Sequence, residues 1–443
     1  MGGVCCRPTP VDFDGDVTLF HFVLLRCVGK GAFGKVRVVQ HKQTRELYAL
    51  KYINKAKCVK MKAVPNVVQE RRLLEEIDHP FIVNLRYAFQ DDENCFFVLD
   101  LMLGGDLRFH LERLGSMDEE VVRFYCRTTV LCCAVFTRQQ HYASVRVEPH
   151  TFHAGPLTCF RRDLKPDNIL LDERGNAHLT DFNIGLKYTD RKLMGVAGSM
   201  AYMAPEILAK RGYSYQIDWW SLGVCAYELI FGRRPFRGRT NSDLTYSITK
   251  DPLKWPEDAE KKCSRPGMQV LKGLLDRDPS RRFGCKPNGE GFQELRRHPW
   301  FKPIDWDTLE SKELTPPFIP DAKKANFDAS HELEELLLED NPLKAKTRKA
   351  NQENFSPEMR QMEEQFTSYD FKKMQRRSYF PHNQLISTAT ATSSGMASSR
   401  PGTPANDLRM ENGVTINSHS LDMDLDGDAM RTERMMMTEK DYQ

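Results

Sequence analysis

Residues 162–171 read RDLKPDNILL, and this stretch decides how the rest of the chain is interpreted. It places a carboxylate at Asp163, a cation at Lys165 and an amide at Asn168 directly before a short apolar strand. Asp181, 13 residues after Asn168, offers a second carboxylate at the end of the next predicted strand. Phosphoryl transfer needs a group that orients a hydroxyl, groups that hold metal, and positive charge near the moving phosphate. The stretch therefore predicts a phosphoryl-transfer site, and the alternative is a polar turn between two strands.

The composition excludes several other classes of protein. The chain has 443 residues and a net charge of +3, which gives no electrostatic case for binding nucleic acid. The length allows more than one folding unit. Twelve cysteines occur without CxxC pairs at zinc spacing and without a preceding signal peptide, which predicts reduced thiols in the cytoplasm. No apolar run is long enough to cross a bilayer.

The N-terminal residues 1–6, MGGVCC, have the pattern of a lipidation signal. Removal of the first methionine would expose Gly2 to myristoylation, and Cys5 and Cys6 would be available for palmitoylation, an arrangement that anchors a protein stably. Cys6 stands where the myristoylation pattern usually has Ser or Thr. The pattern predicts peripheral attachment to a membrane, and the alternative is a disordered terminus with incidental cysteines.

Residues 22–53 are predicted to form an antiparallel meander of strands. Between the first two strands, residues 29–36 read GKGAFGKV, and such glycines let backbone amides approach phosphate oxygens. Dinucleotide-binding folds share the GxGxxG spacing, but there it opens a helix, whereas here it joins two strands. Lys51 follows in the third strand, which directs its ammonium at the phosphates. The apolar face of the meander is assigned to Phe22, Leu24, Val36, Val38, Leu47, Ala49 and Ile53.

Residues 67–77 have the apolar spacing of a helix, and Glu70 is expected on the side that faces the sheet. Glu70 lies 19 residues after Lys51 and can hold its ammonium in place as an ion pair. The alternative is a solvent-exposed charge on the helix.

Residues 96–106, FFVLDLMLGGD, are predicted to form an apolar strand and then a hinge between a small sheet lobe and a larger helical lobe. Leu99 is expected at the back of an adenine pocket, and backbone groups near Asp100 and Met102 are expected to meet the adenine edge. Asp106 either accepts a hydrogen bond from a ribose hydroxyl or caps the following helix.

Taken together, these motifs resemble an AGC-type serine/threonine protein kinase, most closely the YANK group (serine/threonine-protein kinase 32). The closer resemblance is carried by DFN at 181–183 in place of DFG, by LMLGGDL at 101–107, and by IDWD at 304–307 with FIP at 318–320. It implies an α+β bilobal protein-kinase fold, with a small antiparallel β-sheet lobe and a larger, mainly helical lobe. The implied activity is ATP-dependent transfer of the γ-phosphoryl group to Ser or Thr hydroxyls of protein substrates.

The resemblance also implies the residues of the site. Asp163 would orient the hydroxyl and accept its proton, while Lys165 and Lys51 would stabilise phosphate charge. Asn168, which is counted with Asp163 and Lys165 as catalytic, would hold Mg²⁺ together with Asp181. The residues implied to contact ATP are Gly29, Lys30, Gly31, Ala32, Phe33, Gly34, Val36, Ala49, Lys51, Glu70, Asp100, Met102, Asp106 and Leu170.

Residues 195–206, GVAGSMAYMAPE, resemble the end of an activation loop. Gly195 occupies the position of the usual phosphorylated threonine, so phosphorylation at this position is not predicted to switch the enzyme. Ser199 is expected to help orient the substrate hydroxyl. Glu206 and Arg282 match the internal ion pair of the family.

Residues 126–160 depart from the family pattern. In kinases a long amphipathic helix leads from here to the catalytic loop, but the pattern becomes cysteine pairs, a polar run and two prolines. A proline inside a helix costs about 3 kcal/mol, so the whole stretch is not one helix. We hypothesise that it is a translated intron or a gene-model error, which sequencing of the transcript would test. Arg161 also stands where the family has a ring that stacks with Phe182 and with Leu74 and Leu85.

The predicted domain organisation follows from these motifs. Residues 1–21 form the lipidation-type segment, and residues 22–301 form a protein kinase domain with a small lobe (22–98) and a large lobe (99–301). Residues 302–371 form an AGC-like tail with an acidic helix at 332–339, and residues 372–443 are disordered. Residues 366–369, FTSY, are either a hydrophobic anchor or the end of an amphipathic helix.

Two other functions remain open at this point. A pseudokinase or nucleotide-binding scaffold would fit Arg161 and the stretch 126–160, whereas the intact Lys51, Asp163, Asn168 and Asp181 favour an enzyme. A membrane-tethered adaptor would act through the lipidated end and the tail. The acidic residues near the peptide groove do not define a substrate motif.

Overall fold

The computed structural model describes residues 11–30, 34–136, 159–160, 163–182, 186–187, 193, 195, 198–287, 289–303, 305–321, 326, 343–346, 348 and 355–374. The chain divides into two compact units, Met1–Pro381 and His382–Gln443, and all the described residues belong to the first. Several sequence predictions lie outside the described residues. They concern Gly2, Cys5, Cys6, Gly31, Ala32, Phe33, Arg161, Arg162, the acidic helix at 332–339 and the tail beyond 374.

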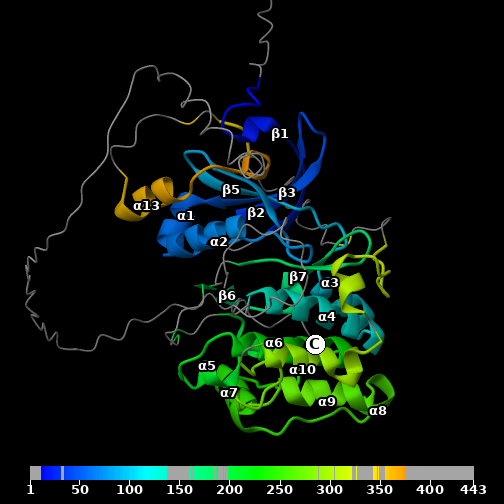
Figure 1. The fold of residues 1–443 in the computed structure, drawn as a ribbon. Coiled ribbons are helices and arrows are strands. Elements are labelled where there is room, and N and C mark those ends of the chain that lie inside the picture. The colour runs from blue at the N-terminus through cyan, green and yellow to red at the C-terminus, as the bar shows by residue number, and fades with distance from the viewer. Residues whose placement is uncertain are drawn as a thin grey trace, which may run out of the picture. The chain divides into compact units, whose positions relative to one another are not determined.

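A six-stranded antiparallel sheet forms the small lobe, with the strand order β1-β2-β3-β5-β4-β10 (Figure 1). The strands are β1 (Phe22–Lys30), β2 (Gly34–His41), β3 (Leu47–Asn54), β4 (Leu85–Gln90), β5 (Asn94–Leu99) and β10 (Tyr369–Asp370). Strand β10 comes from the C-terminal tail and pairs with β4 at the edge of the sheet. The tail is therefore part of the small lobe.

Both faces of this sheet are buried, which corrects the predicted single apolar face. Ala49 pairs with Val38 on one face, whereas Leu24 pairs with Val39 on the other face, where Phe22 also lies. Leu47 remains 45% exposed. Period-two alternation fixes the faces within one strand but not between strands, because the register of pairing sets that relation.

The two faces of the sheet have different covers. On one side lies α2 (Val64–Glu76), which buries Val67, Leu73 and Leu74 and has a proline in its first turn. On the other side, Val17 and Leu19 from the N-terminal segment and Phe371 from the C-terminal segment pack against the same aromatic cluster. A short helix, α1 (Lys55–Lys60), and the tail helix α13 (Pro357–Gln365) contact α2 (Figure 1).

The large lobe is organised around α6 (Gln216–Phe231), in which Trp219 and Trp220 are among the fully buried side chains. It packs against α4 (Glu119–Phe136) and α9 (Arg265–Leu274). The other α-helices within the described part of this region are α3 (Leu107–Leu114), α5 (Pro205–Leu208), α7 (Asn241–Lys250), α8 (Ala259–Lys262), α10 (Glu290–Arg297) and α11 (Trp306–Glu310). Short strands pair as β7 (Ile169–Leu171) with β8 (Ala177–Leu179), and as β6 (Cys159–Phe160) with β9 (Leu186–Lys187).

Helix α4 corrects the predicted start of the irregular stretch. Residues 126–136 continue the helix, and Cys126, Val130, Cys132 and Cys133 are buried. A reduced cysteine packs as a small apolar residue, so Cys126 and the pair Cys132–Cys133 extend the buried face of the helix. Of the stretch 126–160, residues 137–158 lie outside the described residues.

The two lobes meet where the α2–β4 connection touches β8. Leu179 donates a backbone hydrogen bond to the carbonyl oxygen of Phe81 (2.9 Å) and accepts one from the amide of Val83 (3.0 Å). Because β8 leads directly to Asp181, this contact links the small lobe to the predicted metal carboxylate. The bilobal arrangement of an antiparallel sheet and a mainly helical region confirms the predicted fold class. Among the described residues, none of the helices could serve as a membrane span.

Candidate active site

The catalytic-loop motif places the side chains of Lys165 and Asn168 around the carboxylate of Asp163. Lys165 Nζ lies 3.0 Å from Asp163 Oδ2, and the Asn168 amide donates to the carbonyl oxygen and to Oδ2 of Asp163 (2.9 and 3.3 Å). The loop keeps this geometry because Pro166–Asn168 forms a 3-10 turn that runs into the buried strand β7.

The activation-loop end contributes Ser199 to the same group. Its backbone amide donates to Asp163 Oδ1 (2.8 Å), and its hydroxyl accepts from Lys165 Nζ (3.0 Å). Burial raises the pKa of Asp163. The hydrogen bonds from Lys165 and Ser199, together with the positive charge of Lys165, outweigh this effect and hold the pKa of Asp163 below its usual range. The carboxylate is therefore ionised at neutral pH.

Lys51 stands between two carboxylates. Its Nζ lies 2.8 Å from Glu70 Oε1 and 3.8 Å from Asp181 Oδ1, so the ion pair expected between Lys51 and Glu70 is present. Burial lowers the pKa of Lys51, but the negative charges of Glu70 and Asp181 outweigh it and raise the pKa above its usual range. The Lys51 ammonium therefore stays protonated, and Glu70 fixes its position.

Asp181 adopts a left-handed backbone conformation, with φ 63°. Few non-glycine residues occupy this region, and such residues concentrate at functional sites. The next residue, Phe182, is 1% exposed and packs in the same core cluster as Leu74 and Leu85. The prediction that residue 161 lies between Phe182 and the column of Leu74 and Leu85 stays a prediction, because Arg161 lies outside the described residues.

The roof of the predicted nucleotide site is formed by β1, β2 and β3. Val36 pairs with both Gly29 and Lys51, and Ala49 pairs with Leu99. Lys30 ends β1 and pairs with Lys35. At Gly34, a Cβ atom would lie 1.7 Å from the Tyr52 carbonyl oxygen, so only glycine fits between the strands there.

The hinge holds its two predicted carboxylates differently. Asp100 turns its side chain to Arg86 (2.5 and 3.0 Å), and its backbone amide donates to the Asn84 carbonyl oxygen (3.1 Å). Asp106 caps α3 by accepting from the Phe109 amide at 2.8 Å, so the capping alternative is observed. Asp106 also forms an isolated bridge with Leu170, and Met102 packs against the core beside it.

Sequence reasoning named residues 366–369 as a possible anchor but missed the ion-paired and hydrogen-bonded partners that attach the C-terminal tail to α1 and α2. Phe366 is fully buried and contacts the Phe97 ring edge-on (centroids 5.1 Å apart), which supports the anchor interpretation of residues 366–369. Arg71, the neighbour of Glu70, donates to the Thr367 carbonyl oxygen (2.8 Å) and lies over the Phe366 ring. Lys55 is 1% exposed and pairs with Glu363. No local pattern links positions 308 residues apart in the chain.

Two further expectations concern the activation segment. Arg282 forms a two-pronged ion pair with Glu206 (2.7 and 2.9 Å), and both side chains are buried, as expected for the internal ion pair. Gly195 is exposed, and its carbonyl oxygen accepts from the Tyr213 hydroxyl. Gly195 therefore contributes its backbone to the segment's structure.

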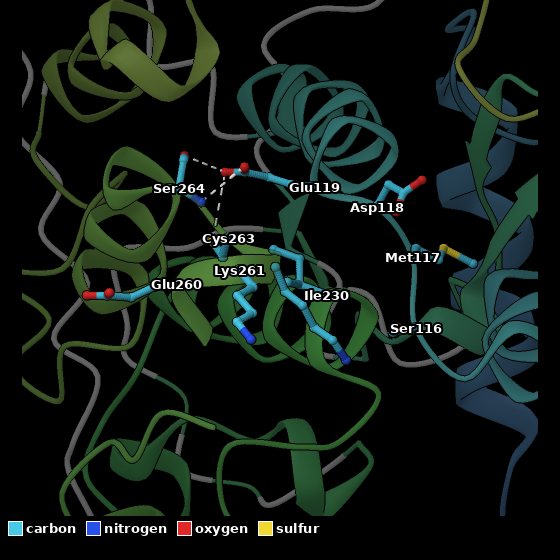
Figure 2. A pocket seen from close by; sticks show the side chains of 10 residues that line it. Ser116, Met117, Asp118, Glu119, Ile230, Glu260, Lys261, Cys263 and Ser264 are labelled. Atoms are coloured by element: carbon cyan, nitrogen blue, oxygen red, sulfur yellow. Dashed lines mark hydrogen bonds between the residues drawn. The ribbon is translucent and has the colours of Figure 1, made fainter. Parts of the chain in front are cut away.

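A separate cavity of about 500 Å³ opens between α4, α6 and α8 (Figure 2). Glu119 in its wall accepts hydrogen bonds from Ser264 Oγ and from Trp300 Nε1, each at 2.6 Å. The first bond joins the start of α4 to the N-cap of α9, and the second joins it to the 3-10 turn Pro299–Phe301. The cavity shares no residue with the predicted nucleotide site.

Comparison with known proteins identifies the family. The protein kinase domain matches residues 22–301. Serine/threonine-protein kinase 32C of Mus musculus is 38% identical over 361 residues, covering 78% of this chain and 67% of that protein. Serine/threonine-protein kinase 32B of Homo sapiens is 38% identical over 358 residues (79% of this chain, 80% of that protein). Serine/threonine-protein kinase sgk-1 of Caenorhabditis elegans is 36% identical over 323 residues (71% and 63%).

The chain belongs to the protein kinase family. Within it, the chain is a serine/threonine kinase, and the predicted resemblance to the AGC type and to the kinase 32 group is confirmed. These matches support the assignment as a serine/threonine kinase, and none of those named here supports the pseudokinase alternative. A protein kinase acts on protein substrates and generally uses ATP and Mg²⁺.

Proposed function

We propose that this chain transfers the γ-phosphoryl group of ATP to Ser or Thr hydroxyls of proteins through Asp163, Lys165, Asn168, Lys51 and Asp181. The observation that supports this assignment most strongly is the group around Asp163. Its carboxylate is ionised, is fixed by Asn168 and by the Ser199 amide, and has an ammonium beside it.

The residues fit ATP and magnesium. Asn168 uses its amide nitrogen for both contacts to Asp163, so its amide oxygen is the atom suited to a cation, and Asp181 provides a carboxylate. Lys51, held by Glu70, would bind phosphate oxygens under the roof formed by residues 29–36 and Ala49. Met102, the carbonyl oxygen of Asp100 and Leu170 would contact the nucleoside, while Asp106 caps α3. When bound, ATP supplies the phosphoryl group and Mg²⁺ neutralises part of its charge.

The side chains of the chain then perform the transfer. Asp163 accepts a hydrogen bond from the substrate hydroxyl through its carboxylate and takes up the proton as the oxygen attacks. Lys165 stabilises the charge that develops on the phosphoryl oxygens, and Ser199 keeps Lys165 and Asp163 aligned. Positioning and electrostatic stabilisation supply nearly all of the catalysis in this class of reaction.

A kinase assay of the full chain with a Ser/Thr peptide tests the assignment. Asp163→Ala should lower kcat by at least about 100-fold, the range expected for losing a positioned base, with little change in ATP binding. Equal rates of wild type and variant would contradict the proposed function and would favour a scaffold.

The proposal extends to the organisation of the chain. We propose the kinase domain at 22–301, with lobes at 22–98 and 99–301, and an AGC-like tail at 302–371. Residues 371–374 form a helical turn, so the ordered tail extends past the predicted boundary at 372. Lipidation at Gly2, Cys5 and Cys6 would attach the N-terminus to a membrane. Membrane partitioning of the chain with and without residues 2–7 tests that attachment.

A further inference from the structure

The N-terminal and C-terminal segments of the small lobe are joined to each other. Lys373 Nζ donates hydrogen bonds to the backbone carbonyl oxygens of Asp14 (2.9 Å) and Gly15 (2.6 Å). Two residues earlier, Phe371 contacts the Tyr87 ring edge-on (centroids 5.5 Å apart) and lies beneath the guanidinium of Arg86 (5.1 Å). In Figure 1 the orange C-terminal segment accordingly passes close to the dark-blue N-terminal segment.

The N-terminal carbonyl oxygens are presented by an ordered turn. His21 is 4% exposed, and its Nε2–H donates to the Asp12 carbonyl oxygen at 2.9 Å, while its Nδ1 accepts from the Thr18 amide at 3.2 Å. Asp12 Oδ1 in turn accepts from the amides of Asp14 and Gly15 (3.0 and 3.2 Å). His21 therefore stabilises the turn whose carbonyl oxygens accept hydrogen bonds from Lys373.

From Lys373 a continuous set of contacts leads to the catalytic ion pair. The preceding residues 369–370 form β10 on the edge of β4, and just before them the Thr367 carbonyl oxygen accepts from Arg71. Arg71 follows Glu70 on α2, and Glu70 holds Lys51. The contact of Lys373 with the N-terminal segment and the Lys51–Glu70 ion pair are thus connected through hydrogen bonds and the helix α2.

We propose that Lys373 is a positioning residue for Glu70, and that the N-terminal segment 11–21 is its anchor. By holding β10 against β4, Lys373 limits the movement of α2 that would separate Glu70 from Lys51. The N-terminal segment thereby contributes to ATP binding without touching the nucleotide. The inference concerns the nucleotide side of the proposed site and is independent of the assignment of Asp163 as the base.

The matched control is the adjacent lysine. Lys372 has the same chemistry, but its Nζ contacts Glu46 on the β2–β3 connection at 3.3 Å. In the full chain, Lys373→Met should raise KM for ATP by about fivefold, within the usual range of coupling between connected sites, with kcat nearly unchanged. Lys372→Met should leave KM unchanged, and Lys373→Arg, which can still donate to both carbonyl oxygens, should restore most of the wild-type value.

Two further measurements separate positioning from general destabilisation. Hydrogen exchange should show faster exchange of the β10 and α2 amides in Lys373→Met but not in Lys372→Met. A double-mutant cycle with His21→Ala should be non-additive, because both changes break the same contact. An unchanged KM in Lys373→Met, an equal rise in Lys372→Met, or additive effects with His21→Ala would overturn the proposal. Loss of activity in Asp163→Ala with no KM effect at Lys373 would retain the kinase mechanism and reject this inference alone.

Discussion

The Nε atom of Arg71 donates a hydrogen bond to the carbonyl oxygen of Thr367 across 2.8 Å, although the two residues are 296 positions apart in the chain. Arg71 adjoins Glu70, and Thr367 follows the fully buried Phe366. The tail is therefore attached to the helix that carries Glu70, one partner of the ion pair with Lys51. Changes to the tail should be measurable at the nucleotide site.

Phe366→Ala should release the tail from α2. A buried phenylalanine reduced to alanine costs about 3–5 kcal/mol, more than a short surface segment can lose and remain docked. We expect fast hydrogen exchange over residues 355–374 and a raised KM for ATP. Tyr246→Ala is the control, since that ring is 64% exposed and should alter neither quantity. Unchanged exchange in the Phe366 variant would show that the anchor does not hold the tail.

Lys165→Ala should change the acid limb of the pH–rate profile. The hydrogen bond and charge of Lys165 help to hold the pKa of Asp163 below its usual range. Removing the ammonium should raise that pKa, so Asp163 becomes protonated at higher pH and the acid limb of kcat/KM moves upward. The measurement is kcat/KM between pH 4.5 and 8, with the exposed Lys250→Ala as control. An acid limb at the same pH in both variants would contradict the role assigned to Lys165.

His79 should make the stability of the protein sensitive to mild acid. Burial lowers the pKa of His79 to about 4, from an ordinary value near 6.5. Because the folded-state pKa is the lower one, stability is fully present above pH 6.5 and is lost as the pH falls toward 4. The linkage amounts to about 2 kcal/mol at pH 5.

His79→Asn tests this linkage. The Nδ1 atom of His79 accepts from the Phe81 amide at 3.1 Å, and the asparagine oxygen can replace that acceptor without titrating. Urea unfolding at pH 7.5 and pH 5 should show a smaller loss of stability in the variant than in the wild type. An equal loss in the two proteins would mean that other groups carry the acid sensitivity.

Glu206→Gln should destabilise the large lobe strongly. The guanidinium of Arg282 is buried and makes two hydrogen bonds to that carboxylate, so the variant leaves a buried charge without its counter-charge. Breaking a buried pair on one side costs about 3–5 kcal/mol. The surface pair of Lys286 and Glu294 is the control, and Glu294→Gln should cost less than about 1 kcal/mol. Equal losses of stability in Glu206→Gln and Glu294→Gln would contradict the predicted difference between the buried and the exposed ion pair.

The sequence predicted well those parts of the site that are local in the chain. Asp163, Lys165 and Asn168 lie within six residues, and a rigid turn followed by a buried strand fixes their relation. The ion pair of Lys51 and Glu70 was also predictable, since it joins one strand to the next long helix. The fold class followed from the resemblance of these motifs to a protein kinase.

Other features depend on contacts that no local pattern records. The faces of the sheet follow from strand register, which alternation within one strand does not specify. The pairing of Lys55 with Glu363 and the grip of Lys373 on the N-terminal segment form only when distant parts of the chain come together. The continuation of α4 was missed because Cys126 and the pair Cys132–Cys133 were interpreted as irregular, whereas reduced cysteines fill a buried helix face well.

Helix α4 extends into residues 126–160, the stretch that departs from the kinase pattern, and so limits which of these residues an intron could encode. Cys132 Sγ donates to the Phe81 carbonyl oxygen at 3.3 Å, so the second half of this helix supports the connection between the lobes. Removing residues 126–160 as a block would delete that support. Because Cys132 makes this contact, a messenger RNA that restores the kinase pattern should have its splice junction after codon 132, and the primers for detecting it should flank the following codons.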